Sequence, residues 1–120
     1  MTTTPRGTSD RVHDRAVIVA KMRLGAEADV GRIFAESDAT SLPYDLRVTE
    51  RSLYSLGDLY VHLVEFECDV DEVMETARRH PGFAEISERL RPYISPYDPQ
   101  NWQSPRDAAA RRFYTWRARS

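Results

Sequence analysis

A long β-hairpin centred on Gly57 constrains the fold of this 120-residue chain more than any other feature. Polar and apolar residues alternate on both sides of the glycine, over residues 46–66, as is typical of strands with one buried face. A tight turn at Leu56-Gly57 would place Arg51 opposite His62. The pattern predicts that these two side chains share one face, unless a bulge at the turn shifts the register.

The two faces of this hairpin differ in polarity. One face combines basic, aromatic and aliphatic side chains: Arg47, Thr49, Arg51, Leu53, Tyr60, His62, Val64 and Phe66. The other face is more apolar in its middle: Leu46, Val48, Glu50, Ser52, Tyr54, Leu59, Val61, Leu63 and Glu65. We expect the first face to suit a polar ligand.

Composition limits the class of protein. With 41% hydrophobic and 30% charged residues, the chain is an ordinary soluble globular domain, and it has no apolar run long enough to cross a membrane. A net charge of -2 argues against a general nucleic-acid binder. The single cysteine, Cys68, excludes a disulfide framework and a cysteine-based zinc site, which fits a reducing cytoplasm.

The remaining patterns predict an α+β fold. Residues 1–12 are expected to form a disordered tail and residues 13–120 a single domain. The expected elements are a strand at 16–24, a helix at 27–37, the hairpin, a helix from Asp69 that Pro81-Gly82 interrupts and Pro92 ends, a loop at 93–106 and a strand at 110–117. Asp69 and Glu72 have the spacing of an N-capping pair. The order β-α-β-β-α-β is ferredoxin-like.

Two helices can cover only one face of a four-stranded sheet. The second face, with Leu46, Val48, Val61 and Leu63, then needs another partner to exclude water. Packing of two such sheets face to face would supply it, so the sequence predicts a homodimer.

Four longer segments carry a resemblance to a known family. They are FAESDATSLP, GDLYVHLVE, ARRHPGFAEISERLRPYISPY and FYTW, and they extend from about Ala16 to Trp116. Together they resemble the aromatic polyketide cyclase family of the tetracenomycin type, which forms dimeric ferredoxin-like α+β barrels. The resemblance implies a cofactor-free enzyme that directs aldol-type ring closure and dehydration of a poly-β-ketone or partly cyclised intermediate. Such enzymes serve type II polyketide synthases, in antibiotic or spore pigment biosynthesis, and the synthase's acyl carrier protein is a candidate partner.

The resemblance also assigns candidate site residues. The proposed catalytic positions of the family correspond to Asp38, Arg51 and His62, whereas Ser37 stands where the tetracenomycin enzyme has a histidine. His62 would exchange protons near neutral pH. Arg51 would hold an enolate oxygen, and Asp38 would orient a neighbour or act as the base. Ser37, Tyr60 and Phe66 are candidates for substrate binding.

Each candidate also has an ordinary structural explanation. His62 could be hydrogen-bonded within the sheet, and Arg51 could pair with a carboxylate such as Glu50 or Glu65. Asp38 and Ser37 could satisfy backbone groups at the end of a helix.

Other functional classes are less consistent with the sequence. The three histidines are scattered and lack metal-ligand spacing, and no phosphate loop, serine elbow or dinucleotide motif is present. Two alternatives stay open: a cofactor-independent anthrone-type monooxygenase, which shares the fold, and a non-catalytic subunit that binds the polyketide.

Overall fold

The computed structural model describes residues 12–103 and 105–119, so all but the last residue of the predicted tail lies outside the described part. Its elements are β1 (Asp14–Met22), α1 (Glu27–Asp38), α2 (Leu42–Asp45), β2 (Val48–Leu56), β3 (Leu59–Phe66), α3 (Val70–Arg78), α4 (Pro81–Leu90), β4 (Ile94–Pro96), the 3₁₀ turns η2 (Pro99–Asn101) and η3 (Pro105–Ala108), and β5 (Ala109–Ala110). Within this part, no helix has the length and apolar character needed to cross a membrane.

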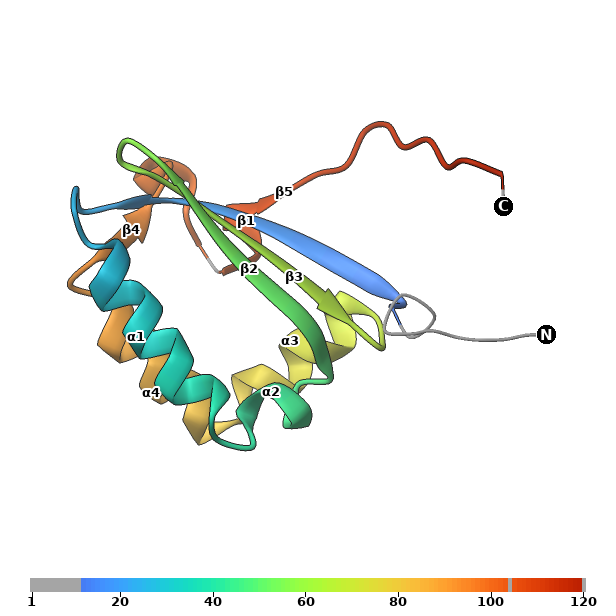
Figure 1. Cartoon of the computed structure of the whole chain (residues 1–120), viewed down its shortest axis with the longest axis horizontal. Helices are drawn as coiled ribbons and strands as arrows, with labels where there is room; N and C mark the ends of the chain where they lie inside the picture. The colour runs from blue at the N-terminus through green and yellow to red at the C-terminus, as the bar shows by residue number, and fades with distance from the viewer. Residues whose placement is uncertain (1–11, 104, 120) are drawn as a thin grey trace.

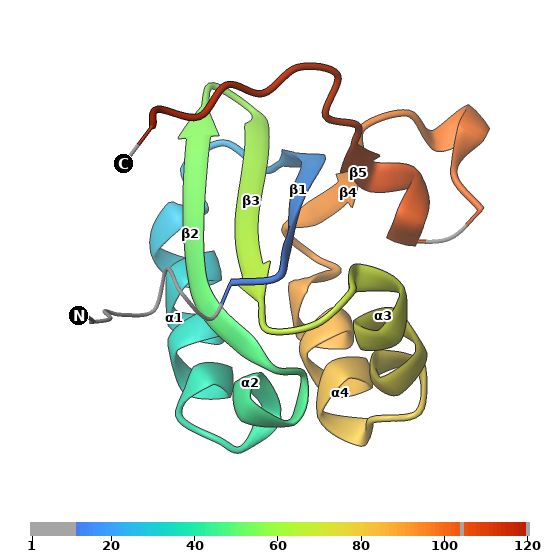
Figure 2. The ribbon, with the colours of Figure 1, turned by 90° about the vertical axis from the view of Figure 1, so that its right-hand side faces the viewer.

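The strands form one antiparallel sheet in the order β2-β3-β1-β4, with β5 also paired to β1. Figure 1 shows the helices gathered on one side of this sheet, and Figure 2 shows its other side, which we call the open face. The predicted α+β ferredoxin-like fold is confirmed. The sheet of a single chain is not closed, so a barrel would require a second copy.

The hairpin turn lies one residue later than the sequence suggested. Leu56 pairs with Leu59, which leaves Gly57 and Asp58 as the two turn residues and places Arg51 opposite Val64, not His62. Gly57 has a φ of 61° at the first turn position, which a type II′ hairpin reserves for glycine. The pairing changes by two residues, so Arg51 and His62 still lie on the same face.

A bulge near the start of β2 changes the faces that were predicted for this strand. The register shifts between Val48 and Glu50, so Val48 packs against the core beneath the helices. Leu46 precedes the strand, at the end of α2, and is also buried. The prediction that Leu46 and Val48 belong to the open face was therefore wrong, whereas Val61 and Leu63 do lie there.

The C-terminal part differs most from the prediction. The fourth strand is β4, inside the expected loop, because an edge strand tolerates Pro96 where a central strand would not. Only Ala109 and Ala110 pair with β1 further along, and residues 111–119 are in no helix or strand. The predicted strand at 110–117 was wrong.

The core lies between the helices and the sheet. Helix α1 contributes Val30, Ile33 and Phe34, the predicted apolar stripe, and these pack with buried residues of β1, β3, α3 and α4. The predicted interruption near Pro81 separates α3 from α4, and Pro81 itself begins α4, since proline is tolerated in a first helical turn. The short helix α2 was not predicted; Pro43 lies in its first turn.

The cap of α3 comes from a distant strand. Asp69 occupies the N-cap position but makes no capping hydrogen bond through its side chain. The backbone N–H of Val70 instead donates to Oδ2 of Asp14 in β1, at 3.1 Å, while Asp69 pairs with His13. The predicted capping pair was wrong because a carboxylate 56 residues away in the chain reaches the helix end.

Candidate active site

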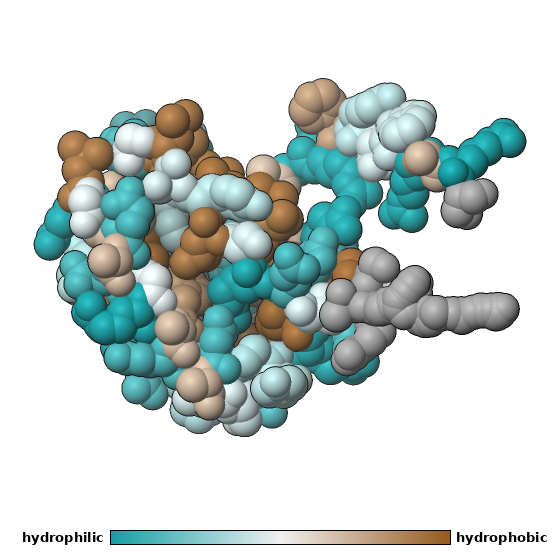
Figure 3. All heavy atoms as spheres, viewed as in Figure 1, coloured by the Kyte–Doolittle hydropathy of each residue, from teal (hydrophilic) through white to brown (hydrophobic). Residues whose placement is uncertain are grey.

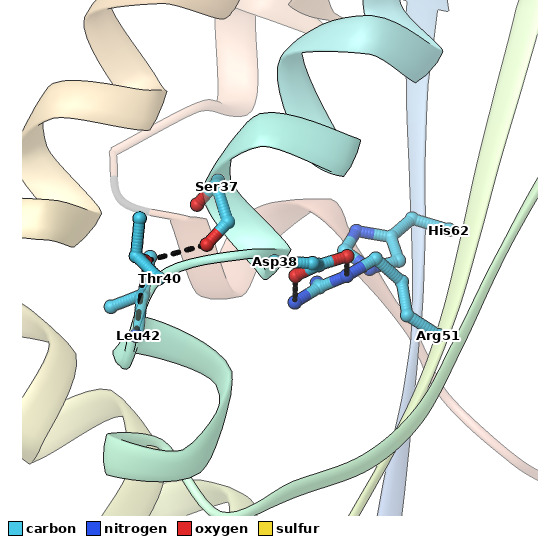
Figure 4. A network of polar contacts seen from close by, with 6 residues as sticks. All are labelled: Ser37, Asp38, Thr40, Leu42, Arg51 and His62. Carbon is cyan, nitrogen blue, oxygen red and sulfur yellow. Dashed lines mark hydrogen bonds and ion pairs between the residues drawn. The ribbon is translucent and has the colours of Figure 1, made fainter.

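Asp38, Arg51 and His62 form a continuous chain of polar contacts between α1 and the sheet (Figure 4). Arg51 donates from Nε to Oδ2 of Asp38 at 3.0 Å and from Nη2 to Oδ1 at 2.8 Å, a bidentate ion pair. Its Nη1 lies 3.1 Å from Nε2 of His62. The three side chains come from the last turn of α1, from β2 and from β3. The prediction that Arg51 and His62 are neighbours is confirmed.

The local structure explains why these side chains meet. Arg51 and His62 point from the sheet toward the helices because both lie on its covered face. Asp38 is the last residue of α1, and Figure 4 shows its carboxylate directed at the guanidinium. The side chains of Arg51 and Asp38 are 15% and 36% exposed, so solvent reaches this cluster from the Asp38 side.

The protonation state of His62 follows from its surroundings. Burial, and secondly the charge of Arg51, lower the pKa of His62 from 6.5 to about 3. The imidazole is therefore neutral at pH 7. Because a guanidinium can only donate, Nε2 is the acceptor in this contact and Nδ1 carries the proton. His62 is thus a weaker base than an ordinary histidine.

The guanidinium of Arg51 retains donors for a ligand. Three of its N–H bonds are used, two to Asp38 and one to His62. A guanidinium has five, so two are left over among the contacts of the described residues. These two belong to the nitrogens that already bind Asp38 and His62, and they can hold one developing oxyanion by charge-assisted hydrogen bonds.

Phe34 is a member of this site that the sequence did not reveal. Its ring centroid lies 5.2 Å from that of His62 in an edge-to-face arrangement and 5.1 Å from Cζ of Arg51. It is 7% exposed, one helical turn before Asp38. Its helical spacing identified Phe34 only as a core residue, because the pattern does not show what lies across the interface.

Ser37 is not brought together with the other candidates. Figure 4 shows it on the side of the helix end away from Arg51 and His62. Its carbonyl accepts a 2.6 Å hydrogen bond from Oγ1 of Thr40, and this hydroxyl oxygen of Thr40 accepts in turn from the N–H of Leu42 at 3.2 Å. This turn fixes the path of the chain immediately after Asp38.

Tyr60 and Phe66 are both buried in the covered face of β3. The ring of Tyr60, 4% exposed, lies edge-on to His62 with centroids 6.2 Å apart, and its burial raises the pKa of Tyr60 far above its usual value. Tyr60 therefore flanks the cluster as a neutral side chain. Phe66 lies at the other end of the strand, opposite Val48, and packs in the core.

The other histidines have structural partners. His80 joins α2 to α4, because Nε2 contacts Oδ2 of Asp45 at 2.9 Å and Nδ1 accepts from the N–H of Gly82.

Among the described residues, no cluster of three or more potential ligands could hold a metal ion. A small cavity of about 100 Å³ between α2 and α3 lies away from Arg51 and is lined by Asp45, Leu46, Arg47, Cys68, Glu72, Val73 and Thr76.

Several known proteins are similar to this chain in both sequence and fold. The polyketide synthesis cyclase family matches residues 14–117. Tetracenomycin F2 cyclase of Streptomyces glaucescens is 40% identical over 104 residues, which are 87% of this chain and 94% of that protein. Its solved structure has a TM-score of 0.81 at 39% identity and covers 89% of this chain and 100% of that one. The chain belongs to the polyketide synthesis cyclase family and is an enzyme of that class.

One further relative and one solved structure with a similar fold can be compared with this chain. Polyketide synthase CurG of Streptomyces cyaneus is 43% identical over 101 residues, which are 84% of this chain and 94% of that protein. The cofactor-independent oxygenase SnoaB of Streptomyces nogalater has a TM-score of 0.51 at 22% identity, and it covers 69% of this chain and 86% of that one. The likeness to the oxygenase shows a shared fold alone.

Proposed function

We propose that this enzyme closes a ring in a poly-β-ketone, or in a partly cyclised intermediate of a type II polyketide synthase, by an intramolecular aldol reaction followed by dehydration. The observation that carries the proposal is the bidentate pair of Asp38 and Arg51 in contact with His62. This arrangement supplies a carboxylate and a cationic oxygen site side by side, which enolate chemistry requires. The names of the similar cyclase and synthase proteins support the substrate class.

In this mechanism Arg51 acts on the reacting oxygen. A ketone oxygen of the substrate binds the two remaining guanidinium N–H groups, which lowers the pKa of the adjacent methylene. Asp38 takes one methylene proton through a lone pair that does not face Arg51. The enolate carbon then attacks a second carbonyl of the same chain, and the new alkoxide takes up the proton that Asp38 had removed, which restores the carboxylate. Loss of a further α-proton and of hydroxide, together one water, completes the dehydration.

His62 has a positioning part in this proposal. With a pKa of about 3, it is neutral throughout the physiological range, so it neither repels the Arg51 cation nor competes with Asp38 for the proton. Its Nε2 holds the third arm of the guanidinium in place. The Nδ1–H group is then a neutral donor that can bind a second substrate oxygen. The ring of Phe34 packs against both His62 and Arg51 and helps to hold them in place.

Product analysis of a reconstituted synthase tests this function. A minimal type II polyketide synthase, with its intermediate on the acyl carrier protein, is incubated with and without the enzyme, in air and without oxygen. We expect a cyclised aromatic product that requires the enzyme but not oxygen. A product formed only in air would establish an oxygenase instead, and unchanged products in both conditions would refute the cyclase proposal for this intermediate. Comparison with free intermediate tests whether the carrier protein is a partner.

A homodimer in the cytoplasm is part of the same proposal. The open face of the sheet carries half-buried Val17, Val19, Val61 and Leu63, and the hairpin end beside them carries Tyr54 and Leu56, 56% and 78% exposed. Apolar surface of this kind commonly marks an interface, and two open faces packed together would close the barrel. Light scattering should give twice the chain mass of 13.8 kDa. The single Cys68 suits a reducing compartment.

A further inference from the structure

The position of Asp38 depends on the chain that follows it. Asp38 is the last residue of α1, and residues 39–41 connect it to α2. The end of a helix is its least stable part, because the last carbonyl groups lack partners within the helix. The bidentate contact with Arg51, at 2.8 and 3.0 Å, therefore requires that the chain beyond Asp38 be held in place.

Helix α2 cannot hold this connection by itself. It has only four residues, about one turn, and a helix of that length is not stable without tertiary contacts. Its Leu42 is buried, and the N–H of this residue donates to Oγ1 of Thr40 in the connection. Contacts that fix α2 from outside therefore also fix the turn that leaves Asp38.

The carboxylate of Asp45 is the polar anchor of α2. Its Oδ2 accepts from Oγ of Ser41, the N-cap residue of the helix, at 2.9 Å and from Nε2 of His80 at 2.9 Å. The hydrogen bond from His80, and secondly that from Ser41, lower the pKa of Asp45 below its usual value, so this carboxylate is ionised at neutral pH. One oxygen atom thus joins both ends of α2 to His80.

His80 connects this anchor to the first turn of α4. Its Nδ1 accepts from the N–H of Gly82 at 3.0 Å, so the ring proton is on Nε2, which donates to Asp45. Gly82 allows the close approach, since a Cβ there would lie 3.2 Å from Nδ1 of His80 and 3.4 Å from Cδ1 of Leu42. Because both ring nitrogens are in use, the imidazole is a rigid link between α4 and α2.

Helix α4 holds the chain on both sides of Asp38. In its last turn Arg89 pairs with Glu36 of α1, two residues before Asp38, and at its start His80 holds α2 through Asp45. Figure 2 shows α2 and α4 side by side. Figure 3 shows side chains filling the space that separates the helices from the sheet in the ribbon of Figure 1. The end of α1 is therefore confined between the sheet and the contacts of α4.

We propose that His80 and Asp45 are positioning residues for ring closure: they fix the turn after Asp38 and so keep its carboxylate in contact with Arg51. The inference rests on the proposed function, in which Asp38 takes the methylene proton, and adds two residues outside the reacting cluster. A shift of about 1 Å would break the bidentate contact, because hydrogen bonds are lost beyond about 3.5 Å. Misplacement by that amount can lower a rate about 10²-fold.

Substitutions of the two residues test whether this link controls the reaction. His80→Asn keeps an N-cap acceptor for α4 but is too short to reach Asp45, and Asp45→Ala removes the carboxylate. We expect either change to lower kcat about 10- to 100-fold at nearly constant KM, because the ketone still binds Arg51. Asp45→Asn keeps an oxygen acceptor and should recover most of the rate. Asp29→Ala is the matched control and should leave kcat unchanged, since Asp29 is as exposed as Asp45, 44% against 45%, and is paired with Arg32 on α1.

A double-mutant cycle shows whether the effect passes through Asp38. In an Asp38→Asn background, His80→Asn should lower the remaining kcat by less than about twofold, since the group that His80 positions is already lost. Equal losses in both backgrounds would show that His80 acts by another route, such as general stability, and would overturn the inference.

NMR of the Asp38 carboxylate separates this inference from the proposed function. The ¹³C shift of the carboxylate reports its contact with Arg51 without substrate or turnover. We expect this shift to change in His80→Asn and Asp45→Ala and to stay constant in Asp29→Ala. An unchanged shift in the first two variants would overturn the inference, whatever their kinetics, and leave the cyclase proposal intact. Failure of the unmodified enzyme to form a cyclised product would refute the proposed function, while the shift would still decide whether His80 holds Asp38.

Discussion

Replacement of Arg51 by methionine tests the centre of the proposed mechanism. Methionine keeps an unbranched, apolar side chain over Phe34 but removes all five N–H donors and the charge. We expect kcat/KM for ring closure to fall by about 10²- to 10³-fold, the loss observed when one preorganised oxyanion donor is removed. This corresponds to about 2.7–4 kcal/mol of transition-state stabilisation.

The structure sets limits on other effects of this change. Asp38 loses a bidentate partner, but its side chain is 36% exposed, so water can replace those bonds at modest cost to stability. The variant should therefore remain folded. Arg51→Lys restores the charge without the planar fork, and we expect it to recover only part of the rate, because the ammonium cannot contact Asp38, His62 and substrate in the same geometry.

Steady-state kinetics with purified intermediate measures the effect on catalysis. Arg32→Met is a matched control, since Arg32 lies on α1 and pairs with Asp29 at 3.1 Å, but its side chain is 55% exposed and outside the site. It should leave kcat/KM unchanged. An Arg51→Met enzyme with the kinetics of the control would refute a role for the guanidinium in the reaction.

Titration of the His62 imidazole by NMR in the same variant separates the two causes of its low pKa. Arg51 is the smaller cause and burial the larger one. The pKa of His62 should therefore rise from about 3 in Arg51→Met but stay below 6.5. A value at or above 6.5 would show that the cation, not burial, keeps the imidazole neutral.

Further predictions concern stability and the support of the site. The pKa of His62 is about 3 in the folded chain, against 6.5 for an ordinary histidine in the unfolded chain. Between pH 3 and pH 6.5 the unfolded chain therefore binds more protons than the folded one. The stability that neutral His62 contributes is fully present above pH 6.5 and is lost as the pH falls toward 3. The free energy of unfolding should fall by up to about 1.4 kcal/mol per pH unit in this range. Denaturation curves of His62→Asn should lack this pH-dependent loss. Phe34→Leu should lower kcat and alter the NMR shifts of His62. Ile33→Val, a core change in the same helix costing about 0.5–1.5 kcal/mol, should alter neither, and equal kinetics in both would make Phe34 purely structural. Asp14→Ala should lower stability by about 1 kcal/mol and Asp69→Ala by less in thermal unfolding, and the reverse order would contradict the cap assignment.

The periodic spacing of polar and apolar residues along the sequence was sufficient to predict the main features of the fold. Strand alternation predicted that Arg51 and His62 share a face, and this held although the pairing shifted by two residues, because an even shift preserves the face. Helical spacing at residues 27–37 identified the buried stripe of α1 and predicted its end to within one residue of Asp38, where the helix does end. These signals are local, so a single segment contains them in full.

Features that depend on the rest of the molecule were predicted less well. A strand was expected at 110–117 from its alternation and aromatic content, but strand pairing needs a partner edge, and β4 and β5 already occupy the free side of β1. The bulge in β2 reversed the side of Val48, and a bulge leaves no clear mark in the alternation of residues. The cap of α3 came from Asp14, which no local motif could indicate.

The candidate site shows the same division. By itself, the sequence determined the α+β order, the shared face of Arg51 and His62 in the hairpin and, through the family motifs, the three residues of the cluster. Only the tertiary structure decided which carboxylate meets Arg51: Asp38 does, whereas Glu65 pairs with Arg15. It also made His62 neutral and placed Phe34 beneath both side chains. Contact and burial arise between segments distant along the chain, so they are properties of the packed molecule and not of any one stretch of residues.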